Sequence, residues 1–116
     1  MTTLNLFQHS SDAVPFKAGE NIFNEGDKAE AMYVVIEGEI DIVHNGQVID
    51  EALKGGLIGE MALLDASPRS ATARARTDCR IVPITEKRFL FLVQQTPFFA
   101  LQVMRIMSER LRRKIK

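Results

Sequence analysis

The chain has 116 residues, 46% of them hydrophobic and 26% charged, with a formal net charge of zero. This length suits one domain with one ordinary core, and the composition excludes a disordered chain. The single cysteine, Cys79, excludes an internal disulfide, and the longest apolar run, Phe89 to Val93, is far too short to span a membrane. Residues 1–10 lack the charged start and long apolar centre of a signal peptide, so we expect a cytoplasmic protein without a membrane span.

The charged residues are unevenly distributed along the chain. Residues 1–66 hold 3 basic and 12 acidic side chains, whereas residues 67–116 hold 12 basic and 3 acidic ones. This asymmetry is one sign of a nucleic-acid or membrane partner, but basic side chains near a helix C-terminus also interact favourably with the helix dipole. A short basic end such as Arg110 to Lys116 is more often solvated, so we expect no nucleic-acid partner.

The first half of the chain reads as β-structure from Phe16 onward, while residues 1–15 predict a loop or short helical turns. A turn sequence is present at Asn24 to Asp27. Met32 to Ile42 then alternate apolar or small residues with polar ones, which predicts an antiparallel strand with one solvent-exposed face. Gly38 marks the place where we expect that strand to bend or bulge.

Turn sequences separate the strands that follow. Asn45-Gly46 is the strongest short hairpin signal, and Val48-Ile49 begins the return strand. Further strands are predicted at Ser70 to Ala75 and at Asp78 to Ile84, with Pro83 near the end of the last one or on a sheet edge. Short strands with regular turns indicate a sandwich or barrel, and the double-sheet antiparallel jelly roll is the form that we expect.

The last third of the chain predicts two helices. Thr85 is the expected N-cap of a helix that ends near Thr96, and Pro97 suits the first turn of a second helix. The second helix carries an apolar stripe that suits packing on the β-structure or against another helix. The stripe consists of Ala100, Val103, Met104, Met107 and Leu111.

The most informative stretch runs from Gly59 to Ala75 and reads GEMALLDASPRSATARA. Gly59 and Glu60 open a short apolar helix, and the free N–H groups at a helix N-terminus favour an anion. Arg69 offers a planar fork of donors to the same anion, and the Glu60 carboxylate can accept hydrogen bonds from sugar hydroxyls. These three residues together predict a site for one small phosphorylated ligand.

This stretch resembles the phosphate-binding cassette of cyclic nucleotide-binding domains. Residues 58–62 (IGEMA) match the first half of the family pattern and residues 68–72 (PRSAT) match the second, with the right gap between them. Both halves together make a specific signal, whereas a lone Gly-Glu or Pro-Arg would carry little weight. The resemblance covers nearly everything from Phe16 to Lys116, and it implies the same jelly roll followed by a hinge helix and a lid helix.

We therefore predict a mainly β fold with C-terminal α-helices, and a single cyclic nucleotide-binding domain over residues 1–116. Its parts are an N-terminal segment (1–15), a β roll (16–84) that contains the cassette (58–75), and the hinge and lid helices (85–116). The cassette is expected to include one short helix.

The resemblance also implies a ligand site formed by the cassette. Arg69 would hold the cyclic phosphate and Glu60 the ribose 2′-hydroxyl, while Gly59 lets the ligand approach the backbone closely. Ser70 occupies the specificity position, where family members with a small apolar residue bind cAMP and those with threonine bind cGMP. Serine leaves both open, and we favour cAMP with cGMP as the second candidate. The expected ligand-binding residues are Gly59, Glu60, Met61, Ala62, Arg69 and Ser70.

The base of such a ligand needs an apolar wall and a cover. Ile42, Ile49 and Ile58 are candidates for the wall, although each also suits an ordinary core position. No aromatic residue is placed obviously to stack on a purine, so the lid helix must supply the cover. Lys114 and Ile115 fall where some family members carry polar base contacts. This end either covers the base, through apolar contact of Ile115 and with Arg112 or Arg113 over its face, or is solvated.

We expect no enzyme activity, metal or cofactor. Two scattered histidines, His9 and His44, cannot build the multi-histidine metal site that enzymes of the cupin type place in a similar roll.

The predicted function is a stand-alone receptor that binds cyclic nucleotide and signals through its C-terminal helices to a protein effector in trans or across a homodimer. The alternative is a jelly-roll interaction module that no longer binds nucleotide, which would be expected to have lost Arg69 or Glu60. The sequence leaves open the partner, the oligomeric state and whether the natural chain is longer.

Overall fold

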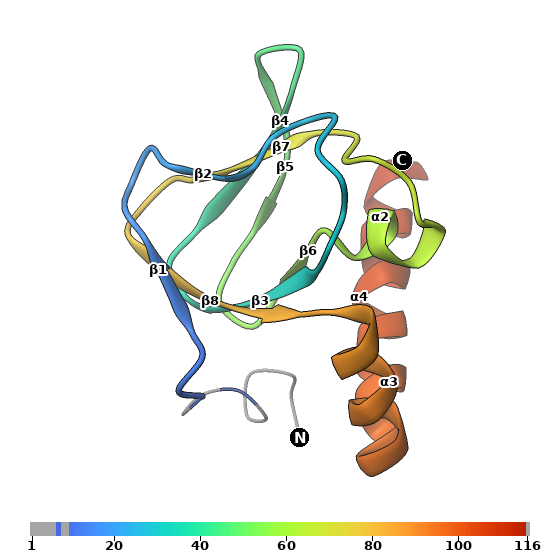
Figure 1. Cartoon of the computed structure of the whole chain (residues 1–116). Coiled ribbons are helices and arrows are strands. Elements are labelled where there is room, and N and C mark those ends of the chain that lie inside the picture. Colours follow the sequence, from blue (N-terminus) through green and yellow to red (C-terminus); the bar gives the residue numbers. More distant parts are fainter. Residues whose placement is uncertain (1–6, 8–9, 116) are drawn as a thin grey trace.

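The computed structural model describes residue 7 and residues 10–115. Within these residues, eight strands form two four-stranded antiparallel sheets, and the C-terminal helices lie at one side of the roll (Figure 1). The first sheet has the order β1 (Val14–Phe16), β8 (Cys79–Ile84), β3 (Met32–Glu37) and β6 (Leu57–Ile58). The second has the order β2 (Asn21–Phe23), β7 (Thr72–Ala75), β4 (Ile40–His44) and β5 (Gln47–Ala52). The helices are α2 (Glu60–Asp65), α3 (Glu86–Gln95) and α4 (Pro97–Ile115), so the predicted jelly roll with a cassette helix and two C-terminal helices is confirmed.

Strand β1 starts earlier than the sequence predicted, at Val14 rather than Phe16. It forms one edge of the first sheet and pairs only with β8, so Pro15, which has no backbone N–H to donate, is tolerated there. Pro83 lies near the end of β8, as predicted. The expectation of a loop or short turns for residues 1–6 and 8–9 lies outside the described residues.

Gly38 divides the predicted strand of Met32 to Ile42 into β3 and β4, which belong to different sheets. The φ angle of Gly38 is +92°, and an added Cβ would lie 2.5 Å from the carbonyl oxygen of Asp78 and 2.5 Å from Cβ of Cys79. The predicted bend is therefore a corner at which the chain crosses from one sheet to the other. Glycine is required there because both the backbone conformation and the space exclude a side chain.

Both faces of β3 are buried, so the prediction of one solvent-exposed face is wrong for this part of the segment. Met32, Val34 and Ile36 pack in one core together with Phe99 of α4. Val35 belongs to a second core, which is formed by residues of both sheets. Because the helices cover the outer surface of the first sheet, the second face of β3 needs apolar residues as well.

Strands β4 and β5 form the predicted hairpin. Asn45 and Gly46 connect His44 to its partner Gln47, and the two turn residues have positive φ angles of 52° and 75°. Positive φ at both central positions is the geometry of a type I′ turn, which matches the twist of the flanking strands. The hairpin projects from one end of the roll (Figure 1).

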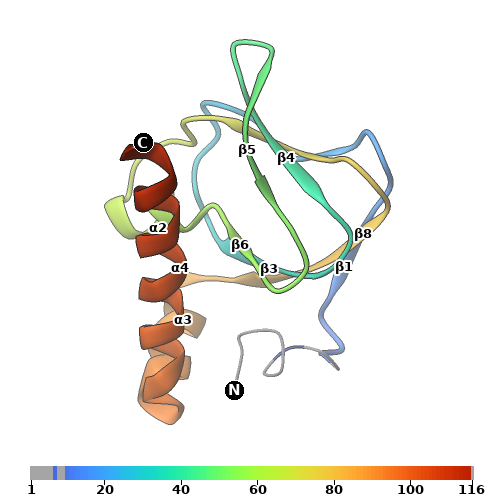
Figure 2. The ribbon, with the colours of Figure 1, turned by 180° about the vertical axis from the view of Figure 1, so that it is seen from behind.

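Both C-terminal helices begin where the sequence predicted. The Thr85 side chain caps α3 by accepting a hydrogen bond from the backbone N–H of Arg88 at 3.2 Å, and α4 begins at Pro97. α4 runs along the side of the roll, with α2 beside its C-terminal half in both views (Figure 1, Figure 2). Within the described residues, no single helix is long and apolar enough to cross a membrane. One pair, α3 and Pro97–Arg113, has that length and composition when the two are counted together, but they are bent by 120° relative to each other.

The predicted apolar stripe of α4 divides between two environments. Val103 is buried in the core that includes β3, and Met107 packs partly buried against the same core. Met104 and Leu111, in contrast, are 57% and 61% exposed. Phe99, which the predicted stripe omitted, is fully buried, because the helix is rotated so that the line through residues 99, 103 and 107 faces the first sheet.

We predict that Gly38→Ala lowers the free energy of unfolding by about 2–5 kcal/mol. Alanine pays for the left-handed backbone conformation, and its Cβ overpacks against Asp78 and Cys79. Gly46→Ala is the matched control, because Gly46 also has a positive φ but an added Cβ there meets nothing within 4 Å. The control should lose only about 1–2 kcal/mol. Equilibrium unfolding in urea measures both variants, and equal losses would show that the close contact at Gly38 is not what requires glycine.

Candidate functional site

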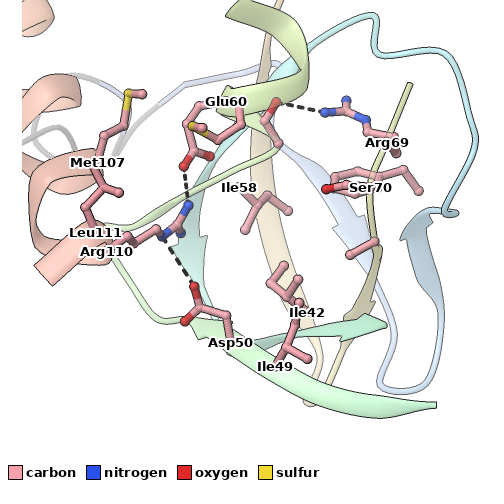
Figure 3. Close-up of a pocket in the computed structure, with 14 residues that line it drawn as sticks. Ile42, Ile49, Asp50, Ile58, Glu60, Arg69, Ser70, Met107, Arg110 and Leu111 are labelled. Carbon is pink, nitrogen blue, oxygen red and sulfur yellow. Dashed lines mark hydrogen bonds and ion pairs between the residues drawn. The ribbon is translucent and has the colours of Figure 1, made fainter. Parts of the chain in front are cut away.

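A pocket of about 220 Å³ opens between the cassette, the second sheet and α4 (Figure 3). This volume lies just below the usual range of roughly 300–1,000 Å³ for small-molecule sites, so the pocket suits a compact ligand. The lining side chains come from both sheets, from the cassette and from the C-terminal half of α4.

The pocket brings together most of the residues that the sequence singled out. Those of the expected ligand-binding set are Gly59, Glu60, Met61, Arg69 and Ser70, with Met61 and Ser70 exposed to solvent. Ala62 follows in α2. The three wall candidates, Ile42, Ile49 and Ile58, also line the pocket. Five further lining residues, which no sequence pattern had marked for the site, are Phe23, Asp50, Met107, Arg110 and Leu111.

Gly59 has a backbone role in the pocket. Its φ angle is +76°, and an added Cβ would overlap the Arg69 guanidinium and lie 3.2 Å from the ring of Phe23. Its carbonyl oxygen accepts a hydrogen bond from Nη1 of Arg69 at 2.8 Å (Figure 3). Glycine is therefore required because the guanidinium packs directly against the main chain at this point.

The backbone of Arg69 is anchored to the turn that follows β2. Its N–H donates to the carbonyl of Asp27 at 2.8 Å, and its own carbonyl accepts from the N–H of Gly26 at 2.8 Å. The guanidinium lies over the ring of Phe23, with Cζ 4.0 Å from the ring centroid, which is a cation–π contact. Sequence reasoning missed Phe23 because β2 lies far from the cassette along the chain, and only the pairing of β2 with β7 brings the two together.

The positive charge of Arg69 is buried beside the pocket. Arg69 is 4% exposed, and its guanidinium forms no ion pair with a carboxylate among the described residues. Nη1 and Nη2 donate to the carbonyls of Gly59 and Ala31, whereas Nε is buried without a hydrogen-bond partner. Burial lowers the pKa of the Arg69 guanidinium from its ordinary value, although arginine stays protonated. A buried charge with an unused donor is stabilised by an anion.

Glu60 is 2% exposed and forms an ion pair with Arg110, which donates from Nη1 to the Oε1 atom of Glu60 and from Nη2 to the carbonyl of Leu57. The expectation that the basic end of the chain is solvated is therefore wrong for Arg110. Its position three residues after Met107 and seven after Val103 places it on the face of α4 that packs on the roll. That spacing was the signal in the sequence that could have found it.

Two looser ion pairs connect α4 to Asp50 of β5. Nε of Arg110 lies 3.9 Å from Oδ2 of Asp50, and Nη2 of Arg113 lies 3.8 Å from Oδ1 of the same carboxylate. Arg112 is exposed, as expected for a solvated helix end. The side chains of Lys114 and Ile115, and with them the predicted cover of a base, lie outside the described residues.

The fold and the pocket together define a jelly-roll domain with a pocket that a buried guanidinium lines. The model of the cyclic nucleotide-binding domain family matches residues 13–96. Because this match covers most of the chain, the chain belongs to the cyclic nucleotide-binding domain family, whose members are regulatory domains that sense cyclic nucleotides rather than catalytic ones.

Similar proteins place the domain in different contexts. The chain is 29% identical to the catabolite activator protein of Thermus thermophilus, with a TM-score of 0.77 over 96% of this chain and 55% of that one. It is also similar to the EAL enzyme Bd1971, solved in a cAMP-bound form (29% identity, TM-score 0.63) and a cGMP-bound form (30%, 0.65), each over 89% of this chain and 29% of the other. Among curated proteins, it is 30% identical to lysophospholipase nte1 of Aspergillus niger in an alignment 104 residues long, which covers 85% of this chain and 7% of that protein.

We predict that Arg110→Met lowers the free energy of unfolding by roughly 3 kcal/mol, because it leaves the Glu60 carboxylate buried and unpaired. The double variant Glu60→Gln with Arg110→Met should recover part of this loss, since a neutral amide is less costly to bury than a carboxylate. Arg112→Met is the matched control on an exposed side chain and should stay within about 0.5 kcal/mol of wild type. A urea-unfolding loss for Arg110→Met no larger than that of the control would contradict the role of the ion pair.

Proposed function

We propose that the pocket binds one 3′,5′-cyclic nucleotide, with cAMP as the favoured ligand, and that the domain passes this signal to a partner in trans. The observation that carries the proposal is the buried guanidinium of Arg69, whose Nε donor is unused and whose charge has no carboxylate partner among the described residues. A cyclic phosphate supplies a negative charge and acceptor oxygens, so it would complete the hydrogen bonding and neutralise the charge.

The phosphate and the ribose are assigned to the cassette. The phosphate lies against Arg69 and the backbone at Gly59, and the exposed hydroxyl of Ser70 donates to a phosphate oxygen. Glu60 accepts a hydrogen bond from the ribose 2′-hydroxyl. Its Oε1 atom already accepts from Arg110, and a carboxylate has acceptor capacity for both partners.

The base is assigned to the apolar side of the pocket, where Ile42, Ile49 and Ile58 form the wall. Met61 and Ala62 contribute main-chain groups rather than side-chain chemistry. Ser70 leaves the choice of base open, and the relative Bd1971, which is solved with either nucleotide, supports a pocket of this kind accepting both. We favour cAMP on the family resemblance and take cGMP as the second candidate.

Signal transmission is assigned to the contact between the pocket and α4. Arg110 of α4 binds the carboxylate that we assign to the ribose, so a ligand at Glu60 changes the electrostatic environment that holds α4 against the roll. A ligand that binds more tightly when α4 is in one of two positions shifts the protein toward that position. Leu101 and Met104 are exposed on α4, and we propose this surface as the contact for a protein effector or a second copy of the chain.

Calorimetric titration of the purified protein with cAMP and then cGMP tests the ligand assignment. We expect micromolar binding by wild type and binding weaker by about tenfold or more in Arg69→Lys, because lysine keeps the charge but loses the planar fork of donors. The ratio of the two wild-type affinities shows which base the pocket with Ser70 prefers. Unchanged affinity in Arg69→Lys would show that the guanidinium of Arg69 does not bind the phosphate.

Arg69 also supports the local fold, because its guanidinium holds the carbonyls of Gly59 and Ala31. Weaker binding by Arg69→Lys is therefore informative only if the variant is folded, so a thermal melt must accompany each titration. Ser70→Ala is a companion variant on an exposed residue and should leave Tm unchanged. It should retain cAMP binding, because family members with a small apolar residue at this position bind cAMP, and should weaken cGMP binding. Absence of binding of either nucleotide to folded wild type would favour the interaction module that no longer binds nucleotide.

A matched pair of substitutions on α4 tests the proposed contact surface. Met104 is 57% exposed, so Met104→Glu should leave Tm nearly unchanged and weaken any dimer seen by size-exclusion chromatography. Met107 packs against the core and lines the pocket, so Met107→Glu should lower Tm, because it buries an unpaired charge. A dimer that survives Met104→Glu would exclude this face as the contact between two copies.

A further inference from the structure

Asp50 is a second carboxylate in the pocket, and the roles assigned above do not use it. It lies on β5, and its side chain is 17% exposed. Figure 3 shows it near Ile42 and Ile49, on the far side of the pocket from Arg69. A carboxylate at this place is unexpected in a wall that is otherwise apolar, because burying a charge costs free energy unless partners compensate it.

The partners of Asp50 compensate its charge without using all of its acceptor capacity. Oδ1 accepts a hydrogen bond from the backbone N–H of Glu51 at 2.8 Å. The two nearby guanidinium groups lie at 3.9 Å (Arg110) and 3.8 Å (Arg113), beyond hydrogen-bonding distance. Neither guanidinium therefore occupies Oδ2 with a hydrogen bond, and this oxygen keeps acceptor capacity for a donor in the pocket.

The position of Asp50 restricts what that donor can be. Asp50 lies across the pocket from Arg69 and close to Ile42 and Ile49 (Figure 3). If the phosphate lies at Arg69 and the base lies along the two isoleucines, an edge of the base therefore lies toward Asp50. A carboxylate accepts hydrogen bonds, so the ligand must present a donor there, and on a purine base that donor is an N–H group. The N–H donors on the edge of a purine base are chiefly its exocyclic amino groups.

The geometry points to Asp50 as a specificity residue that accepts a hydrogen bond from an amino group of the purine base. This inference rests on the proposed cyclic nucleotide function and adds a recognition contact on β5, outside the cassette. A site built to bind an N–H group discriminates against a ligand that lacks it, because the carboxylate is then left without its donor. The rival explanation is that Asp50 only positions α4 through Arg110 and Arg113.

Two pairs of ligands separate these explanations, since the members of each pair differ by one amino group. The first pair is cAMP and purine riboside 3′,5′-cyclic monophosphate; the second is cGMP and inosine 3′,5′-cyclic monophosphate. Calorimetry on wild type should show the amino-bearing member of one pair binding about tenfold more tightly, the usual effect of a hydrogen bond to a charged group. Asp50→Ala should abolish that preference and leave the amino-free member within about twofold of its wild-type affinity.

Arg113→Gln is the control for an effect through α4, because it removes one ion-pair partner of Asp50 while Arg113 itself does not line the pocket. This control should keep the amino preference. Asp50→Asn, which retains a carbonyl acceptor of the same shape, should keep part of the preference and guards against a loss caused by a cavity. Thermal melts establish that each variant is folded.

Three results would overturn the inference in distinguishable ways. Equal weakening of both members of each pair by Asp50→Ala would reduce Asp50 to a positioning residue for α4. A wild-type protein that binds cyclic nucleotides without any amino preference would remove Asp50 from base recognition. Failure of wild type to bind any of the four nucleotides would overturn the proposed function itself.

Discussion

The guanidinium of Arg69 is held away from water where the cassette, the turn after β2 and the start of β3 meet. Carbonyl oxygens of Gly59 and Ala31 accept its hydrogen bonds, and the ring of Phe23 covers its face. A charge removed from water is costly unless it is paired, and these dipoles compensate it only in part, because Nε has no partner. The same side chain therefore connects separate segments of the fold and makes the pocket attractive to an anion.

The pocket and the last helix share a network of charges. Glu60 is almost fully buried at the start of α2 and pairs with Arg110 of α4, and Asp50 of β5 faces the same arginine. Desolvation offsets much of the attraction in such a pair, so its main effect is on geometry rather than on net stability. A ligand that binds these carboxylates, as we propose, would therefore act directly on the contacts that hold α4 against the roll.

The features that the sequence predicted correctly depend on residues that are close together in the chain. Asn45-Gly46 forms its turn because both residues tolerate positive φ, and Thr85 starts α3 by capping a neighbouring N–H group. The predictions that failed depend on distant partners. The second face of β3 is buried because α4 packs on it, and Arg110 is shielded because α2 lies beside the same helix.

The sequence by itself determined the jelly roll, the family and the place of the cassette, since turn residues, helix caps and motif spacing act over a few neighbouring positions. Only the tertiary structure decided that the segment of Met32 to Ile42 divides between two sheets and that Phe23 lies against Arg69. It also brought Asp50 and Arg110 into the pocket. Strand pairing and helix docking decide these contacts, and both join segments that are far apart in the chain and leave little local pattern in it.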